Sequence, residues 1–150
     1  MKVAIVVDWL TEVGGAERVL LAIHQLYPNA PIYTSQYRPQ RIDWFKDATV
    51  KTGWLNVFPR RLRKFMAPLR VLYFNHLDLT EYDLVISVVN AEAKGIRTAS
   101  SAVHVAYLQG PPTQYYWGQY KEYLRNPGFG KLNFLARFGL KVLIKPMRRL

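Results

Sequence analysis

Three short segments hold the residues whose types and spacing could do chemistry, and each follows an apolar run. The first is Gly14-Gly15, which stands immediately before a helical pattern. Two glycines there let backbone N–H groups approach a ligand closely, and a helix N-terminus favours an anion. The spacing is not the G-x-G-x-x-G of dinucleotide-binding folds. A tight turn that needs positive φ explains the pair equally well, and Glu17 complements the helix dipole.

The second segment, residues 90–97, reads NAEAKGIR and follows a strongly apolar stretch. Lys94 and Arg97 could meet a phosphate or the pyrophosphate of a sugar-lipid, because both cations donate charge-assisted hydrogen bonds. A short solvated helix capped by Gly95 is the alternative. Taken by itself, the segment favours that alternative.

The third segment, residues 109–117, reads QGPPTQYYW. Its paired prolines fix the backbone, and Tyr115 and Tyr116 beside polar amides suit contact with a carbohydrate or an apolar tail. For Trp117 we favour the alternative of an aromatic anchor that holds the next helix to the core. Gln109, at the end of a predicted strand, is a candidate for substrate contact.

Metal and nucleophile chemistry find no support in the residue pattern. His24, His76 and His104 lie far apart without metal-ligand spacing, so we expect them to be structural or exposed. No carboxylate pair or Ser-His-Asp arrangement is evident, and the chain has no cysteine for a disulfide or thiolate site. We therefore expect no metal and no bound cofactor.

Apolar periodicity supplies the elements that would position these segments. Residues 2–8 and 82–89 are continuous apolar runs, which are typical of strands buried on both faces of a parallel sheet. Strands alternating with helices predict one α/β domain with helices on both faces, in which ligands bind beyond the carboxyl ends of the strands. We expect further strands at 31–36, 48–52 and 103–108, and helices at 16–27, 60–74 (kinked by Pro68), 113–124 and 131–145.

The net charge of +11 belongs to the last hundred residues, because the first fifty hold five basic and five acidic residues. Residues 51–75 contain six basic residues and no acid, and residues 121–150 contain eight against Glu122 alone. A localised basic surface favours a polyanion such as nucleic acid, anionic lipid or a phosphorylated substrate. The sequence carries no recognised nucleic-acid motif, so we do not expect a nucleic-acid partner.

Two predicted helices combine an apolar stripe with a basic one, a design suited to anionic membrane surfaces. The ordinary alternative is a core helix with a solvated charged face. We expect a cytoplasmic protein peripheral at the membrane, because residues 1–8 do not resemble a signal peptide and no run is long enough to span a bilayer. The expected membrane-facing residues are Arg60, Arg61, Arg63, Lys64, Arg137, Lys141 and Lys145.

Taken together, the motifs resemble glycosyltransferase family 4, the retaining GT-B enzymes of polysaccharide assembly. The similarity is carried by GGAER at 14–18, YDLVIS at 82–87 before AKGI at 93–96, and HVAY at 104–107 leading into Pro111 and Trp117. These motifs follow in order through nearly all of the chain. Their order and spacing make the resemblance specific, whereas each motif alone is weak.

The resemblance implies a Rossmann-like, N-terminal, acceptor-binding domain of an enzyme that transfers a mannosyl or glucosyl unit from a nucleotide-sugar. The acceptor would be lipid-linked or a saccharide, and the nucleotide-sugar would be a co-substrate rather than a cofactor. By analogy, Gly14 and Gly15 face the donor diphosphate or sugar. The implied acceptor-binding residues are Asn90, Lys94, Arg97, Tyr115 and Tyr116.

The chain departs from the family at two positions. Gln109-Gly110-Pro111 stands where the family often has His-Thr-Pro, and Asn90 replaces a second histidine. An amide is no general base at neutral pH, so Gln109 is expected to orient substrate rather than move protons. The resemblance also implies that retaining transfer uses the donor phosphate itself, so that these replacements need not abolish activity.

The donor-binding C-terminal domain is missing from residues 1–150, so we expect the chain to be a fragment that is inactive alone. The alternative is a non-enzymatic module that binds membranes or polyanions, or a subunit that takes its donor domain from another chain.

Overall fold

The structure is a computed structural model, and it describes residues 1–110, 119–128 and 130–149. The chain divides into two compact units, Met1–Gln109 and Gly110–Leu150. Each unit is described by itself below. The predicted helix at 113–124 begins outside the described residues, and only its end is seen, as α3 (Tyr120–Arg125).

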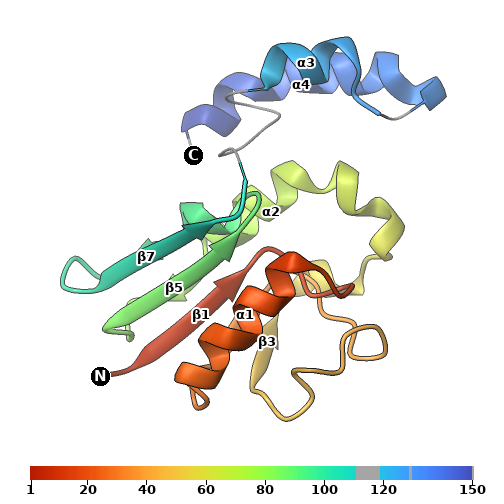
Figure 1. Ribbon diagram of the computed structural model, residues 1–150. Helices are drawn as coiled ribbons and strands as arrows, with labels where there is room; N and C mark the ends of the chain where they lie inside the picture. Colours follow the sequence, from red (N-terminus) through yellow and green to blue (C-terminus); the bar gives the residue numbers. More distant parts are fainter. Residues whose placement is uncertain (111–118, 129, 150) are drawn as a thin grey trace. The chain divides into compact units, whose positions relative to one another are not determined.

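The first unit contains a five-stranded parallel sheet, which confirms the predicted α/β class (Figure 1). Every predicted strand is present, although most are shorter by one to three residues. The strands are β1 (Val3–Val7), β2 (Ile32–Thr34), β3 (Val50–Thr52), β5 (Leu84–Val89) and β7 (Val103–Leu108). Their order is β3-β2-β1-β5-β7, and all four neighbouring pairs run parallel.

Both faces of the sheet are covered at its central strands β1, β2 and β5, which explains the apolar runs there, whereas the side chains of β7 are largely exposed. Ile5 and Val7 pack on one face with Leu20 of α1 (Gly15–Leu26), in a cluster that includes Ile42 and Phe45. On the other face, alternate residues of β1 pack with α2 (Ala67–Asn75). The members of this second cluster include Ala4, Val6, Leu55, Met66, Tyr73, Phe74, Val85 and Val89.

The predicted continuous helix at 60–74 is wrong in one respect. The segment forms a 3-10 helix, η2 (Arg60–Phe65), and then α2, and the two are separated at Met66. Pro68 lies in the first turn of α2 instead of kinking a longer helix. Proline fits a first turn because its missing N–H would have no helical partner there.

Short strands and 3-10 turns lie between the longer elements of the first unit. In the first unit, β4 (Asp78–Leu79) pairs with β6 (Arg97–Thr98), and two further 3-10 turns are η1 (Trp54–Val57) and η3 (Ala93–Gly95). The second unit contains α3, η4 (Gly130–Leu132) and α4 (Asn133–Arg149). None of the helices formed by the described residues has the length and apolar character needed to span a membrane.

Candidate functional site at the carboxyl edge of the sheet

The strand order reverses direction at β1. From β1 the chain crosses through α1 to β2 on one side, whereas β5 lies on the other side of β1. At such a switch point the loops after the two central strands diverge, and open α/β sheets bind their ligands in the resulting crevice. The loop after β1 leads to Gly14-Gly15, and the loop after β5 begins at Asn90. The fold therefore brings two of the three predicted segments to the expected place.

The tight-turn explanation of the glycine pair is wrong. Neither glycine has positive φ, and Gly14 is the extended N-cap residue of α1. A Cβ on Gly14 would lie 2.9 Å from Oε2 of Glu17, so a neighbouring side chain accounts for that glycine. A Cβ on Gly15 would meet no atom within 4 Å. Within the described part of the chain, neither backbone conformation nor packing requires a glycine at position 15.

Glu17 lies in the first turn of the helix that begins at Gly15, and it is almost fully buried. Burial raises the pKa of Glu17, and the backbone N–H groups of Glu17 itself and of Gly14 oppose that shift. The expectation that Glu17 complements the helix N-terminus agrees with this geometry.

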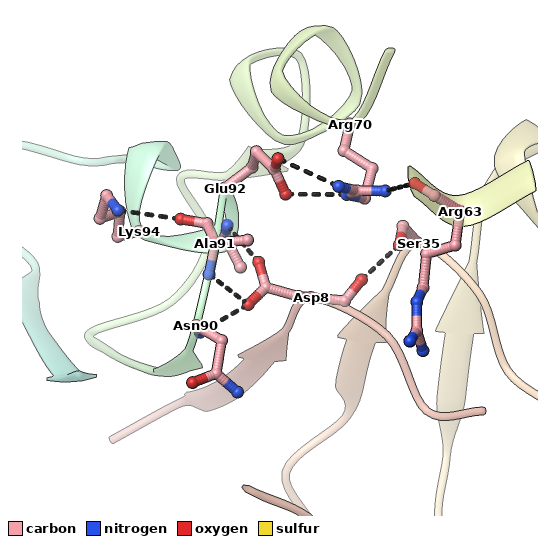
Figure 2. Close-up of polar contacts among 9 residues, drawn as sticks. Asp8, Ser35, Arg63, Arg70, Asn90, Ala91, Glu92 and Lys94 are labelled. Carbon is pink, nitrogen blue, oxygen red and sulfur yellow. Dashed lines mark hydrogen bonds and ion pairs between the residues drawn. The ribbon is translucent and has the colours of Figure 1, made fainter. Parts of the chain in front are cut away.

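Asp8, at the end of β1, holds the loop that follows β5 (Figure 2). Oδ2 of Asp8 accepts hydrogen bonds from the N–H groups of Asn90 (2.7 Å) and Ala91 (2.9 Å), and Oδ1 accepts one from Ala93 (2.8 Å). The carboxyl group is buried. Burial raises the pKa of Asp8, the nearby charge of Glu92 adds to the rise, and the three N–H groups lower it.

A second set of polar contacts joins the same two loops through the segment that carries η2 and α2. Arg70 donates to both carboxylate oxygens of Glu92, at 2.7 and 3.1 Å, and this ion pair is buried. The guanidinium carbons of Arg70 and Arg63 lie 5.1 and 4.6 Å from the ring centre of Trp9. Glu12 in turn accepts hydrogen bonds from Arg63 at 2.9 Å and from Arg60 at 2.7 Å.

Sequence reasoning missed Asp8, Trp9, Arg70 and Glu92. One signal was available, because Asp8 directly follows five apolar residues at the carboxyl end of a buried strand, where ligand sites of parallel sheets lie. No sequence pattern pairs Arg70 with Glu92, which is 22 residues away.

The predicted acceptor residues differ in where they lie: Asn90 is at the carboxyl edge of the sheet, Lys94 and Arg97 lie in η3 and β6, and Tyr115 and Tyr116 are outside the described residues. Asn90 is exposed at the carboxyl edge, and Gln109 lies beside it, because the N–H of Gln109 donates to the carbonyl of Val89 at 3.1 Å. Nε2 of Gln109 is buried and has no hydrogen-bond partner within the described residues.

Lys94 and Arg97 do not fit the predicted role at this edge. Nζ of Lys94 donates to the carbonyl of Ala91 at 3.0 Å, so this side chain stabilises its own loop. Burial lowers the pKa of Lys94. Arg97 lies in β6 and pairs with Asp78 of β4, outside the five-stranded sheet. The solvated-helix alternative is also wrong, because Ala91, Glu92 and Ala93 are buried.

Three of the seven predicted membrane-facing cations have partners in the protein. Arg60 and Arg63 bind Glu12, and Arg137 donates to the carbonyls of Leu124 and Arg125 at the end of α3. Arg60 and Arg63 thus bind a carboxylate of the loop after β1, whereas Arg137 is exposed as predicted while it bonds the end of α3. Arg61 and Lys141 are exposed as predicted. The side chains of Lys64 and Lys145 lie outside the described set.

Part of the apolar stripe of the same segment faces solvent. Phe65 is 54% exposed, and Leu62, Leu69 and Leu72 are also exposed. Leu62 and Phe65 lie in η2, Leu69 and Leu72 lie in α2, and Val57 stands nearby in the sequence with 80% exposure. We call Leu62, Phe65, Leu69 and Leu72 the apolar row. Met66 and Tyr73, which also belong to the predicted apolar stripe, are buried, so the segment buries one part of that stripe and exposes the other.

The fold also pairs a serine with a histidine across neighbouring strands. Oγ of Ser87 and Nε2 of His104 lie 2.8 Å apart. Ser87 is completely buried in the middle of β5, so no substrate reaches its hydroxyl group and the pair cannot act as a nucleophile and its base. Burial lowers the pKa of His104, which indicates that the neutral ring is the form that fits the fold.

This histidine should make the fold sensitive to mild acid. The unfolded chain protonates His104 near pH 6.5, but the folded chain does so only at lower pH, so stability falls as pH decreases below about 6.5. We expect His104→Gln, which keeps a hydrogen-bonding side chain, to lose less stability than the wild type between pH 7 and pH 5. Urea unfolding at several pH values measures this difference.

His76→Gln is the control, since His76 is an exposed histidine that bonds the carbonyl of Leu72 in its own helix. Parallel curves for the wild type and His104→Gln would contradict the assignment.

The groups gathered at the carboxyl edge suit binding rather than proton transfer. Among the described residues, Asp8 and Glu92 are both engaged by protein donors, His24 and His104 lie within α1 and β7, and His76 follows the end of α2. What faces outward is the start of α1 at Gly15 and the amide of Asn90. The described part of the chain contains no cluster of three histidines or acids that could hold a metal ion.

Comparison of the chain with protein-family models, with curated proteins and with solved structures finds no significant match. The fold class therefore rests on the sheet itself. The function has to be argued from the switch point and from the motifs.

Proposed function

We propose that the chain is the N-terminal, acceptor-side domain of a retaining GT-B glycosyltransferase similar to family 4. In this proposal the intact enzyme transfers a mannosyl or glucosyl unit from a nucleotide-sugar to a lipid-linked or saccharide acceptor. The nucleotide-sugar is a co-substrate, and a donor-binding domain completes the site. The proposal rests on the ordered motifs of the sequence together with the place to which the fold brings them.

The observation that carries the proposal is Gly15. It opens a twelve-residue helix at the switch point of a parallel sheet, and nothing in the described chain requires it to lack a side chain. A glycine of this kind leaves room for the backbone to approach a ligand closely. The helix N-terminus there favours a negatively charged group, which fits the diphosphate of a nucleotide-sugar.

Asn90 and Gln109 supply neutral hydrogen-bonding groups next to this position. An amide binds a sugar hydroxyl through either its N–H or its carbonyl, but it does not abstract a proton at neutral pH. We therefore assign both residues to acceptor or sugar orientation. Because Lys94 bonds its own loop and Arg97 lies in β6, we assign the acceptor contacts of this domain to Asn90, Gln109 and the tyrosines at 115 and 116.

A transfer assay on the intact native protein tests the proposal. The intact mass of that protein comes first, because a mass near twice that of these 150 residues would reveal a following domain. UDP-hexoses and GDP-mannose are then offered with lipid-linked and saccharide acceptors. Transfer with retained anomeric configuration is expected. A native product that ends at Leu150 and binds no nucleotide-sugar would instead favour the non-enzymatic module.

We further propose that this domain lies on an anionic membrane surface, and that the apolar row rather than the basic stripe makes the contact. The row exposes three leucines and a phenylalanine, with Arg61 beside it and no acid between residues 51 and 75. Exposed apolar residues that border cations insert at the boundary of headgroups and acyl chains, and the cations add attraction to anionic lipid. The proposed location is the cytoplasmic face.

The double variant Phe65→Ser/Leu69→Ser is expected to lose most binding to vesicles of mixed neutral and anionic phospholipid. Removing about 80 Å² of buried apolar surface per side chain costs roughly 2 kcal/mol by area. Cosedimentation at low and high salt measures the effect. Arg61→Ala should weaken binding mainly at low salt.

Arg60→Ala is the matched control, because this cation pairs with Glu12 and is not required to face lipid. Equal binding of the double variant and the wild type would rule out the apolar row as the contact. If the double variant instead unfolds more easily while its vesicle binding persists, the row packs against protein.

A further inference from the structure

The two loops that meet at the switch point are joined by a third segment of the chain. The loop after β1 contributes Trp9, and the loop after β5 contributes Glu92. Between them lies the guanidinium group of Arg70 from α2, which bonds Glu92 and stacks over the Trp9 ring. Figure 2 shows the bonds between Arg70 and Glu92. Arg70 is 5% exposed, so these contacts are made largely away from water.

The geometry requires a planar, forked donor at this position. Nε and one terminal nitrogen of Arg70 bind the two oxygens of Glu92, while its other terminal nitrogen donates to the carbonyl of Arg63. The flat face of the same group lies over Trp9. A lysine ammonium carries the same charge but cannot make a bidentate contact and a stacked contact together.

Asp8 alone does not fix the relation between the two loops. It follows β1 and holds Asn90, Ala91 and Ala93, so it anchors the loop after β5 to the sheet. The stretch from Trp9 to Gly14 runs beyond that anchor. Arg70 contacts this stretch at Trp9, and Arg63 contacts it at Trp9, Thr11 and Glu12.

We propose that Arg70 is a positioning residue, which fixes the loop that leads to Gly15 against the loop that begins at Asn90, so that both present one rigid edge to a ligand. Naming the ligand as a nucleotide-sugar rests on the function proposed above. The mechanical coupling of the two loops does not depend on that proposed function. Arg70 acts through Trp9 and Glu92 and does not itself touch the ligand.

Arg70→Lys is the test, with amide hydrogen exchange as the first measurement. The variant is expected to speed exchange by about tenfold or more in residues 9–13 and in residues 90–93 together, because both loops lose the same contact. Leu79→Ala is the control. It removes a buried side chain of β4, so it lowers stability but leaves the hydrogen bonds and the ring contact of Arg70 in place.

Affinity supplies a second measurement on the intact native protein, with UDP-glucose and GDP-mannose as probes. Arg70→Lys is expected to weaken binding of the accepted donor at least fivefold, and Leu79→Ala is expected to leave it unchanged at a temperature where both variants are folded. Adding Asn90→Ala to Arg70→Lys should weaken binding less than Asn90→Ala does in the wild type, since a displaced loop has already lost part of that contact.

The outcomes separate the two proposals. Faster exchange in only one of the two loops, or an equal effect of Leu79→Ala on both, would overturn the positioning role. Coupled exchange together with no binding of either probe by the wild type would support the positioning role and count against the glycosyltransferase. Binding by the wild type that Arg70→Lys leaves unchanged would overturn the role of the coupling in ligand binding.

Discussion

Gly15→Val is expected to abolish hexosyl transfer by the intact enzyme and to leave the fold in place. A Cβ at position 15 meets no protein atom within 4 Å, so we expect the valine side chain to project into the space that the proposed donor occupies. A fall in kcat/KM of at least about a hundredfold is expected, which corresponds to about 2.7 kcal/mol of transition-state binding. Steady-state transfer kinetics and thermal unfolding of the same preparation measure both effects.

Two further variants sharpen this result. Gly15→Ala should also reduce transfer, while its unfolding free energy stays equal or rises by up to about 1 kcal/mol, because alanine favours the helix and restricts the unfolded chain. Gly139→Val in α4 is the matched control, since a Cβ there also meets nothing within 4 Å. Full transfer by Gly15→Val would remove the main support for donor binding at this helix. Vesicle binding should be the same in all three variants.

Asp8→Asn is expected to lower the free energy of unfolding by about 3 kcal/mol. Three backbone N–H groups point at the two carboxylate oxygens, and an asparagine directs its own NH₂ group towards at least one of them. The loss is smaller than the sum of three charge-assisted hydrogen bonds, since the variant also removes a buried charge that Glu92 repels. A domain of this size should unfold roughly 10 °C lower.

Asp43→Asn is the control for this substitution. Asp43 is an exposed aspartate whose nearest cation, Lys46, lies 3.7 Å away, and surface pairs of this kind contribute little. Calorimetry on both variants measures the difference. If Asp8→Asn proves as stable as Asp43→Asn, the three N–H groups find other acceptors and Asp8 is not the anchor of the loop after β5.

Local sequence was sufficient to predict the sheet. Residues 3–7 are apolar throughout and residues 84–89 are apolar except for Ser87, and a parallel strand covered on both faces requires this pattern whatever its neighbours are. Breaks in such patterns at Gly14 and Pro28 marked the ends of α1 correctly to within one residue. The position of ligand loops beyond the carboxyl ends of strands then followed from the fold class, and it identified the Gly14-Gly15 and Asn90 segments.

The interior of the segment from Arg60 to Phe74 could not be predicted in the same way. Its basic and apolar residues alternate so that either set could face the protein, and local periodicity does not distinguish the two orientations. The choice depends on carboxylates from distant loops. Glu12 binds Arg60 and Arg63, and Glu92 binds Arg70. Arg63 also lies over the Trp9 ring. With these arginines bound to the protein, the apolar row is left exposed.

The sequence by itself determined the α/β class, the positions of the strands and the order of the motifs, because each of these depends on residues that are neighbours along the chain. The tertiary structure decided which polar groups are free to meet a ligand. Asp8, Glu92 and Lys94 are occupied by the protein, whereas Gly15 and the side chain of Asn90 face outward. The physical reason is that a charged side chain near a buried edge is fixed by whichever opposite charge or N–H group the fold brings within about 3 Å, and that distance is not encoded locally.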